Sequence, residues 1–259
     1  MSPKNFSYRT SRALTTELLV GLVTVVSLAG CSSSMDVAGA STDSDTASAL
    51  QSEQPPINAD PVISEIPDSQ WARMVKTGTW RPGCPVGRAD LIRLQVNFVN
   101  FEGRVKRGEL VAHRDSVDDL ADIFSALFEA KFPIERMRAV EKYDGDLERS
   151  LNANNTSAFN CRRPDQINAP VDESPHANGR AVDINPFQNP WKNPRCKCWV
   201  PANDFGKARE GNGVITENSL PWKLFTERGW IWQNIKVPDY MHFDTGYPSR
   251  NRGSDVAAP

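Results

Sequence analysis

Two short segments far apart in the chain each combine a histidine with acidic residues. The first, residues 174–183, reads Ser-Pro-His-Ala-Asn-Gly-Arg-Ala-Val-Asp and contains His176 and Asp183. The second, residues 239–243, reads Asp-Tyr-Met-His-Phe and contains His242. The whole chain has only three histidines, so two of them fall in these segments. A fold that brings the two segments together would gather imidazole and carboxylate groups at one place.

These residue types suit a catalytic zinc site, which needs three protein ligands and one open position for water. Two imidazoles and one carboxylate leave a net positive charge, which acidifies the bound water. His176 and Asp183 are too far apart for one helical turn, but Gly179 between them permits a sharp turn. Alternation along a strand would then direct Asp183 to one face and Val182 into the core. With His242 on a neighbouring strand, the sequence predicts one ion held by these three side chains.

A fourth residue has the position of a general base. Asp239 precedes His242 by three residues. A carboxylate beside the metal, but not bound to it, can take a proton from metal-bound water and pass it to a leaving amine. Each segment alone could be an ordinary surface or capping pair, and their joint use of two histidines favours a site. The third histidine, His113, is predicted to be structural.

The pattern Ser-x-His-x-x-Gly-x-Ala-x-Asp, followed far downstream by Asp-x-x-His-Phe, resembles the VanY-type D-alanyl-D-alanine carboxypeptidase family of zinc peptidases. This family also contains L-alanyl-D-glutamate endopeptidases. The resemblance is clearest over residues 110–246 and is to the extracellular bacterial branch. It includes the runs Phe-Pro-Ile at 132–134, Asn-Asn-Thr-Ser-Ala-Phe-Asn-Cys-Arg at 154–162 and Asp-Ile-Asn-Pro at 183–186.

The resemblance implies roles for individual residues. His176, Asp183 and His242 would bind one Zn²⁺ per chain, and Asp239 would be the catalytic base. Some relatives carry glutamate at the base position, and aspartate is typical of the endopeptidase-like branch. The implied scaffold is the zinc-binding fold that Hedgehog domains share with D-Ala-D-Ala peptidases.

Two further positions match residues that act on the substrate in the family. Ser174 matches a serine that contacts the substrate, and Arg162 matches an arginine that polarises the scissile carbonyl. Amide hydrolysis generates an oxyanion, which a fixed guanidinium would stabilise. The adjacent Arg163 is the alternative match, and a surface charge is the alternative role for Arg162.

The expected function is therefore hydrolysis of an amide bond in peptidoglycan stem peptides by metal-activated water. Carboxypeptidase and endopeptidase activities are both compatible with the sequence, and residues 185–213 form the loop expected to decide between them. The alternative is a non-catalytic, zinc-containing module that binds the cell wall, since this scaffold also occurs without peptidase activity. The presence of Asp239 favours catalysis. A third option is a structural domain held by its cysteines.

The N-terminus indicates export. A cationic start is followed by a short apolar stretch, residues 18–28, and then by Leu-Ala-Gly-Cys ending at Cys31. This resembles the lipobox of bacterial lipoproteins, in which the cysteine is acylated. The alternatives are a plain secretory signal or a short anchor. We expect a chain held to a bacterial membrane by its N-terminal lipid and facing the cell wall.

An exported chain can form disulfides. Besides Cys31 there are four cysteines, Cys84, Cys161, Cys196 and Cys198, which permit three pairings. One or two disulfides are expected rather than a four-thiolate zinc site, because only the last two cysteines are close in sequence. The net charge of −2 does not favour nucleic acid as a partner, and we expect a monomer.

The expected organisation is a signal peptide over residues 1–30, a flexible tether over 31–69, a peptidase domain over 70–250 and a short tail over 251–259. The tether is rich in Ser, Asp, Ala, Thr, Gln and Pro and lacks apolar periodicity. Within the domain, short strands interspersed with helices predict an α+β fold with a small antiparallel sheet and flanking helices.

Periodicity places the main elements of the domain. A helix is predicted over residues 117–128, capped by Asp115 or Ser116 and stopped before Pro133. Strands are predicted over residues 91–101, 110–112, 230–232 and 241–243, a further short strand between turns at 102–103 and 106–109, and a second helix over 220–228.

Overall fold

The computed structural model describes residues 58–163, 166, 174–201, 204–207 and 209–246. All described residues belong to one compact unit. No helix in the described residues is long and apolar enough to cross a membrane. The predicted signal peptide, Cys31 and the tail over residues 251–259 lie outside the described residues.

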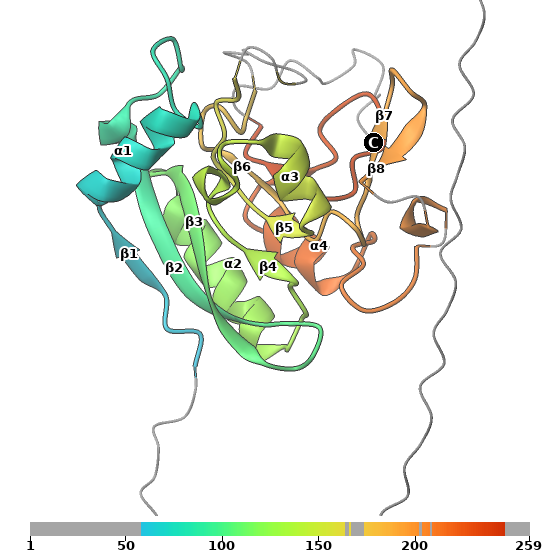
Figure 1. Ribbon diagram of the computed structural model, residues 1–259. Helices are drawn as coiled ribbons and strands as arrows, with labels where there is room; N and C mark the ends of the chain where they lie inside the picture. Colours follow the sequence, from blue (N-terminus) through green and yellow to red (C-terminus); the bar gives the residue numbers. More distant parts are fainter. Residues whose placement is uncertain (1–57, 164–165, 167–173, 202–203, 208, 247–259) are drawn as a thin grey trace, which may run out of the picture. The chain divides into compact units, whose positions relative to one another are not determined.

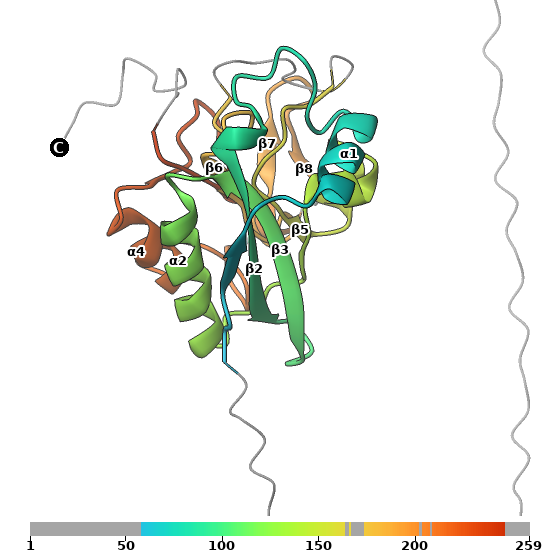
Figure 2. The same cartoon turned by 90° about the vertical axis from the view of Figure 1, so that its left-hand side faces the viewer.

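A three-stranded antiparallel sheet forms one side of this unit (Figure 1). It contains β1 (Val62–Ser64), β2 (Leu91–Val99) and β3 (Val105–His113), in that order. Leu94, Val96 and Phe98 of β2 are buried, while the alternate residues are less so. The helix α2 (Val117–Glu129) packs against β2, and its buried residues join the same apolar core. Figure 2 shows α2 on one side of this sheet and α1 (Asp68–Thr77) on the other.

The structure corrects one prediction in this sheet. Residues 106–109 were expected to form a turn, but they belong to β3, which pairs with β2 along its whole length. Gly108 lies opposite Val96, and a Cβ atom on Gly108 would lie 2.5 Å from the Sδ atom of Met137. The glycine is therefore required for close packing of a side chain against the strand, and it does not mark a turn.

The folded part also begins earlier than predicted. The tether was expected to reach residue 69, but β1 pairs with β2 and α1 starts at Asp68. Ile66 is 2% exposed and packs with Met74 in a second apolar cluster. Three strand residues between polar neighbours give too little periodicity to be recognised in the sequence. Their pairing with a long strand nearly 30 residues away stabilises them.

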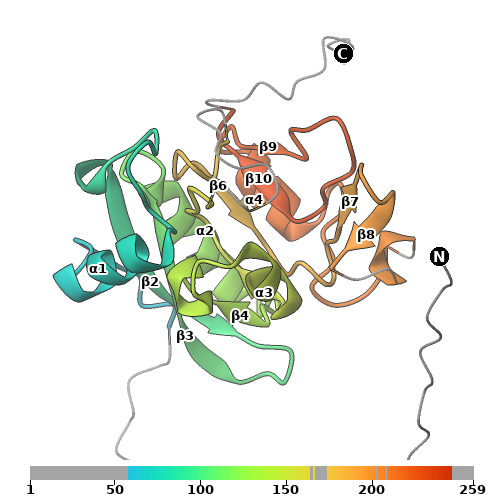
Figure 3. The same cartoon turned by 45° about the horizontal axis from the view of Figure 1, so that its top comes forward.

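A second antiparallel sheet contains Asp183 and His242, one from each of the two histidine-containing segments. Its order is β6 (Ala181–Asp183), β10 (His242–Asp244) and β9 (Ile231–Trp232), and α4 (Leu220–Thr226) lies beside it (Figure 3). Phe243 of β10 stacks on Phe225 of α4 with ring centroids 4.1 Å apart. Val182, Phe243 and Phe225 belong to the core that α2 covers, so the apolar residues of β6 and β10 fix this sheet to the first one.

The remaining elements are short. The strands β4 (Arg136–Met137) and β5 (Asn155–Thr156) pair in parallel, and β7 (Trp191–Asn193) and β8 (Cys198–Val200) form a hairpin. Single turns of 3₁₀-helix occur at Arg88–Asp90, Val140–Tyr143 and Asp204–Gly206, and α3 spans Leu147–Asn152. Small antiparallel sheets with few helices confirm the predicted α+β class. The predicted helices start at the expected residues, and α4 ends two residues before the predicted 228.

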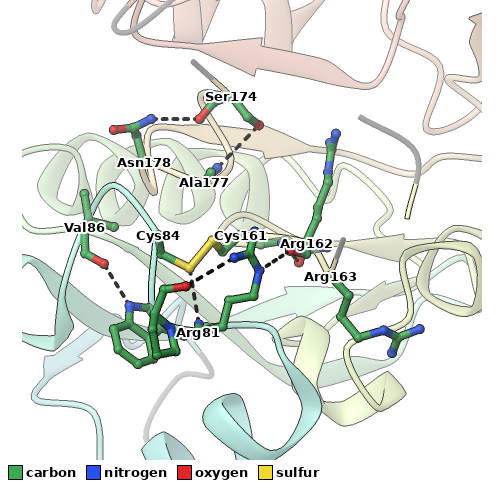
Figure 4. The surroundings of a disulfide bond; sticks show 12 residues. Arg81, Cys84, Val86, Cys161, Arg162, Arg163, Ser174, Ala177 and Asn178 are labelled. Carbon is green, nitrogen blue, oxygen red and sulfur yellow. Dashed lines mark hydrogen bonds between the residues drawn. A yellow bond between two sulfur atoms is a disulfide. The ribbon is translucent and has the colours of Figure 1, made fainter. Parts of the chain in front are cut away.

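Four cysteines form two disulfides, Cys84–Cys161 and Cys196–Cys198. This pairing excludes the four-thiolate zinc alternative, because no free thiolate remains among them. The first disulfide joins residues 77 positions apart. Restriction of so long a loop in the unfolded chain stabilises the fold by about 4.5 kcal/mol. It also fixes the extended segment after β5, which leads directly to Arg162 (Figure 4).

Candidate metal centre

Three side chains meet at the junction of β6, β10 and the turn before β6. His176 Nε2 lies 3.1 Å from His242 Nδ1 and 3.2 Å from Asp183 Oδ1. His242 Nδ1 lies 3.1 Å from the same Asp183 oxygen. Zinc–ligand bonds of about 2.0–2.1 Å at tetrahedral angles separate two ligand atoms by roughly 3.3 Å. The three atoms therefore already form the triangle that one face of a tetrahedral site requires.

The pairing of β6 with β10 creates this triangle. Asp183 and His242 are directly opposite each other in the antiparallel register, and directly opposed side chains project to the same face. The third donor comes from a tight turn that needs Gly179, whose φ is +70°. A Cβ atom there would lie 2.7 Å from the backbone nitrogen of His113, which donates to the Gly179 carbonyl. The predicted roles of the turn and the strand are both confirmed.

The outward nitrogen of each imidazole is held by a fixed acceptor. His176 Nδ1 lies 2.7 Å from the carbonyl oxygen of Ala158, which can only accept. His242 Nε2 lies 3.0 Å from Oδ2 of Asp244. When each ring is neutral, it donates its N–H to this outward acceptor, which leaves the nitrogen that faces Asp183 available to bind a metal. This arrangement fixes the tautomer that a metal ligand needs.

A positive charge would stabilise the cluster of His176, Asp183 and His242. The three residues are at most 8% exposed, and three lone pairs face one another at hydrogen-bond distance. Burial alone would lower the pKa of His242, but its hydrogen bonds to Asp183 and Asp244 raise that pKa to about 10. Burial acts in the opposite direction on Asp183, yet the two histidines hold its pKa well below its usual range. Either a proton or a cation satisfies this cluster, and borderline-soft nitrogen ligands suit zinc.

Asp239 lies beside the triangle and outside it. Its carbonyl oxygen accepts from the His242 backbone nitrogen at 3.2 Å, so both residues belong to one turn. Burial raises the pKa of the Asp239 carboxyl to about 7; the Asp183 charge adds to this, and His242 and Arg162 oppose it. Its Oδ1 atom is buried and has no hydrogen-bond partner among the described residues. A carboxylate poised near neutral pH with a free acceptor oxygen is equipped to exchange a proton.

The structure distinguishes the two candidate arginines. The charges of Asp183 and Asp239 act on the guanidinium of Arg162, whose Nε is buried without a partner among the described residues. The guanidinium of Arg163 instead donates to the carbonyl oxygen of Asp144 at 3.1 Å. Figure 4 shows the two side chains diverging from adjacent positions. Arg162 is therefore the arginine that faces the acidic side of the site.

Ser174 lies at the start of the ligand turn. Its Oγ accepts from the backbone nitrogen of Ala177 at 3.4 Å, and its carbonyl oxygen accepts from that of Asn178 at 3.1 Å. Figure 4 shows the Ala177 contact together with a second bond to the same carbonyl oxygen, from Asn178 Nδ2 at 2.9 Å. Ser174 thus helps to shape the loop that carries His176. Its contact with substrate stays a prediction.

Asp244 is a functional residue that the sequence analysis missed. It is fully buried, and its Oδ1 accepts from Asn234 Nδ2 at 3.0 Å and from the backbone nitrogen of Gly246 at 2.6 Å. Its other oxygen holds His242. A signal was present, because residues two apart on a strand share a face and the sequence reads His-Phe-Asp over 242–244.

Removal of the Asp244 carboxylate should weaken zinc binding. We expect Asp244→Asn to lower zinc affinity about 10-fold and Asp244→Ala up to about 100-fold, since such partners orient and polarise the ligand they hold. Competition with a chromophoric chelator measures this affinity. Asp118→Asn, an exposed site in the first turn of α2, is the matched control. Zinc binding by Asp244→Ala at wild-type strength would contradict the role assigned to this contact.

The part of the chain that carries this site is similar to a known protein family. Residues 168–245 match the family model described as D-alanyl-D-alanine carboxypeptidase. The matched stretch contains the three candidate ligands and Asp239, and it confirms the resemblance deduced from the sequence. Arg162 lies outside it. No curated protein and no solved structure matches the chain. Among the described residues, His176, Asp183 and His242 form a group that could hold a metal ion.

Proposed function

We propose that the protein is a zinc-dependent peptidase that hydrolyses an amide bond in peptidoglycan stem peptides. The observation that carries this proposal is the combination of a preformed ligand triangle with a separate buried carboxylate, Asp239, whose Oδ1 has no hydrogen-bond partner among the described residues. A site that only stored a structural metal would need four protein ligands and no free base. The family match supports peptidase activity of this kind.

His176, Asp183 and His242 would hold the zinc ion. When bound, zinc supplies a Lewis acid that polarises the scissile carbonyl and lowers the pKa of water. The chain's own contribution to this step is orientation. The hydrogen bonds from the two imidazoles to Ala158 and Asp244 keep both ring nitrogens directed at one point, so little reorganisation is needed when the ion binds.

Asp239 would act as the general base and then as the general acid. Its buried Oδ1 accepts a proton from the attacking water and delivers it to the departing amine nitrogen. The base must be ionised, so activity should fall as the pH is lowered through the pKa of Asp239. The positive charge of a bound zinc ion would move that pKa below the value of about 7 found for the protein without the ion.

Arg162 would stabilise the negative charge that develops on the carbonyl oxygen. Burial lowers the pKa of this guanidinium, and the charges of Asp183 and Asp239 oppose that effect. Arginine remains protonated under such conditions. A buried cation whose Nε has no hydrogen-bond partner in the described part of the chain is therefore available to the substrate, and its interactions are stronger there than in water.

The substrate class and the location rest on the sequence. The family resemblance supports stem peptides as substrate, cleaved either at D-Ala–D-Ala or at L-Ala–D-Glu. The lipobox-like segment ending at Cys31 supports attachment to a bacterial membrane through an N-terminal lipid, with the site facing the cell wall. We propose that the protein acts there as a monomer, with no nucleic acid as partner.

Digestion of muropeptides tests the proposal. The full chain, purified in detergent and loaded with zinc, should release D-alanine or split the L-Ala–D-Glu bond, as detected by mass spectrometry. A chelator should abolish the reaction, and added zinc should restore it. Zinc-dependent retention of muropeptides without any cleavage would instead establish the alternative, a non-catalytic cell-wall-binding module.

A further inference from the structure

The hairpin of β7 and β8 borders the metal centre on the side of Asp239. Its first residue, Trp191, forms an isolated antiparallel bridge with Asp239. Two backbone hydrogen bonds flank this pair, from Lys192 to the Pro238 carbonyl at 2.7 Å and from Tyr240 to the Pro190 carbonyl at 3.4 Å. This pattern marks a non-hydrogen-bonded pair, in which opposed side chains lie closest and project to the same face. The side chains of Trp191 and Asp239 therefore start from directly opposed backbone positions and leave on the same face.

The indole nitrogen of Trp191 is a buried donor with no hydrogen-bond partner among the described residues. Other tryptophans of the domain differ in this respect. The indole N–H of Trp80 donates to Val86 O, that of Trp230 to Asp119 and that of Trp232 to Tyr240 O. Leaving a buried donor unpaired is costly, so such a group indicates a partner that is not part of the protein.

Side chains next to Trp191 and Asp239 hold the two backbone segments that carry them. Lys192, the next residue, projects to the opposite face of β7 and lies over the ring of Trp199, with Nζ 4.9 Å from the ring centroid. Trp199 in turn stacks on Tyr240, the residue after Asp239, at 5.3 Å. The guanidinium of Arg209 covers Tyr240 at 4.0 Å. The two backbone segments that carry Trp191 and Asp239 are thus locked together by side chains on both strands.

We propose that the indole N–H of Trp191 donates a hydrogen bond to the α-carboxyl oxygen of the residue that leaves during hydrolysis. This inference rests on the proposed function. Asp239 passes its proton to the departing nitrogen, so that nitrogen lies next to Asp239. The α-carboxyl group is attached one carbon further on. Trp191, on the strand that pairs with Asp239, offers a donor that has no hydrogen-bond partner among the described residues. Both candidate bonds present an α-carboxyl group there, on D-alanine or on D-glutamate linked through its side chain.

Trp191→Phe tests the hydrogen bond, because phenylalanine keeps an aromatic ring and removes the N–H. The matched substrates differ only in the α-carboxyl group of the leaving residue: D-alanine is replaced by ethylamine, or D-glutamate by 4-aminobutyrate. We expect Trp191→Phe to lower kcat/KM about 10-fold on the complete stem peptide, the effect of one lost hydrogen bond, and less than about 2-fold on the truncated one. Equal losses on both substrates would show that the residue acts through structure alone.

Zinc content and Tm should be unchanged in Trp191→Phe, and Trp71→Phe on α1 is the matched control for the substitution itself.

A binding measurement separates this inference from the proposed function. The sample is the zinc-loaded Asp239→Asn protein labelled with ¹⁵N-tryptophan, whose indole N–H groups are observed by NMR. The indole signal of Trp191 is identified as the one that is absent from the spectrum of the Trp191→Phe protein. The complete stem pentapeptide should shift that signal, and the truncated peptide should not. A shift without hydrolysis by the wild type would refute only the proposed function. A stationary signal under saturating peptide, with hydrolysis intact, would refute the inference alone.

Discussion

Asp239→Asn is expected to lower kcat by about 10²- to 10⁴-fold, the usual contribution of a positioned general base, while the protein still binds one zinc ion. Asparagine has the shape of aspartate but cannot take up a proton. The side chain is not one of the three converging donors, and its Oδ1 is free of protein partners in the described part of the chain. The substitution therefore removes proton transfer and leaves the ligand triangle intact.

Steady-state kinetics on the cleaved stem peptide measure the loss of kcat, and atomic absorption measures the zinc content of the same protein. Asp118→Asn, the exposed control on α2, should behave as wild type. The wild-type pH profile should show an acid limb below neutral pH that belongs to Asp239, because only its ionised form accepts a proton. Full activity in Asp239→Asn would exclude this residue as the base, and loss of zinc would show instead that it is a ligand.

The ligand set could be predicted because strand alternation and turn chemistry are local. Gly179 marks the turn, and the two-residue period of a strand directs Asp183 away from the buried Val182. The scarcity of histidine then left two possible partners, His113 and His242, and the family pattern favoured His242. The register of β6 against β10, with Asp183 opposite His242, follows once the apolar residues of both strands face the same core.

Other features depend on contacts between distant segments and could not be predicted in this way. The pairing of Trp191 with Asp239 joins residues 48 positions apart through a single bridge. A single bridge produces no alternation of apolar and polar residues from which it could be predicted. The same holds for β1, which has three residues and is stabilised by pairing with β2. The choice between Arg162 and Arg163 depended on backbone conformation, since Arg162 has a φ of +64° that directs the two side chains apart.

His176→Ala should abolish zinc binding and activity together, which Asp239→Asn should not. His176 supplies one of three donors, and its removal leaves two ligands that cannot close a tetrahedral site. Activity should fall by at least about 10³-fold, because both the polarised carbonyl and the acidified water depend on the ion. The loss should not be restored by raising the zinc concentration within the micromolar range.

Thermal unfolding tests the same assignment without any substrate. A ligand that binds only the folded state at 100 times its Kd stabilises it by about 2.7 kcal/mol, which raises the Tm of a domain of this size by roughly 5–10 °C. Zinc should produce this shift in the wild type and in Asp239→Asn, and a chelator should reverse it. His113→Gln changes the histidine at the end of β3, outside the triangle, and should retain the shift. A zinc-induced rise of equal size in His176→Ala would mean that the ion binds elsewhere, because the wild-type rise must come from the site that His176 completes.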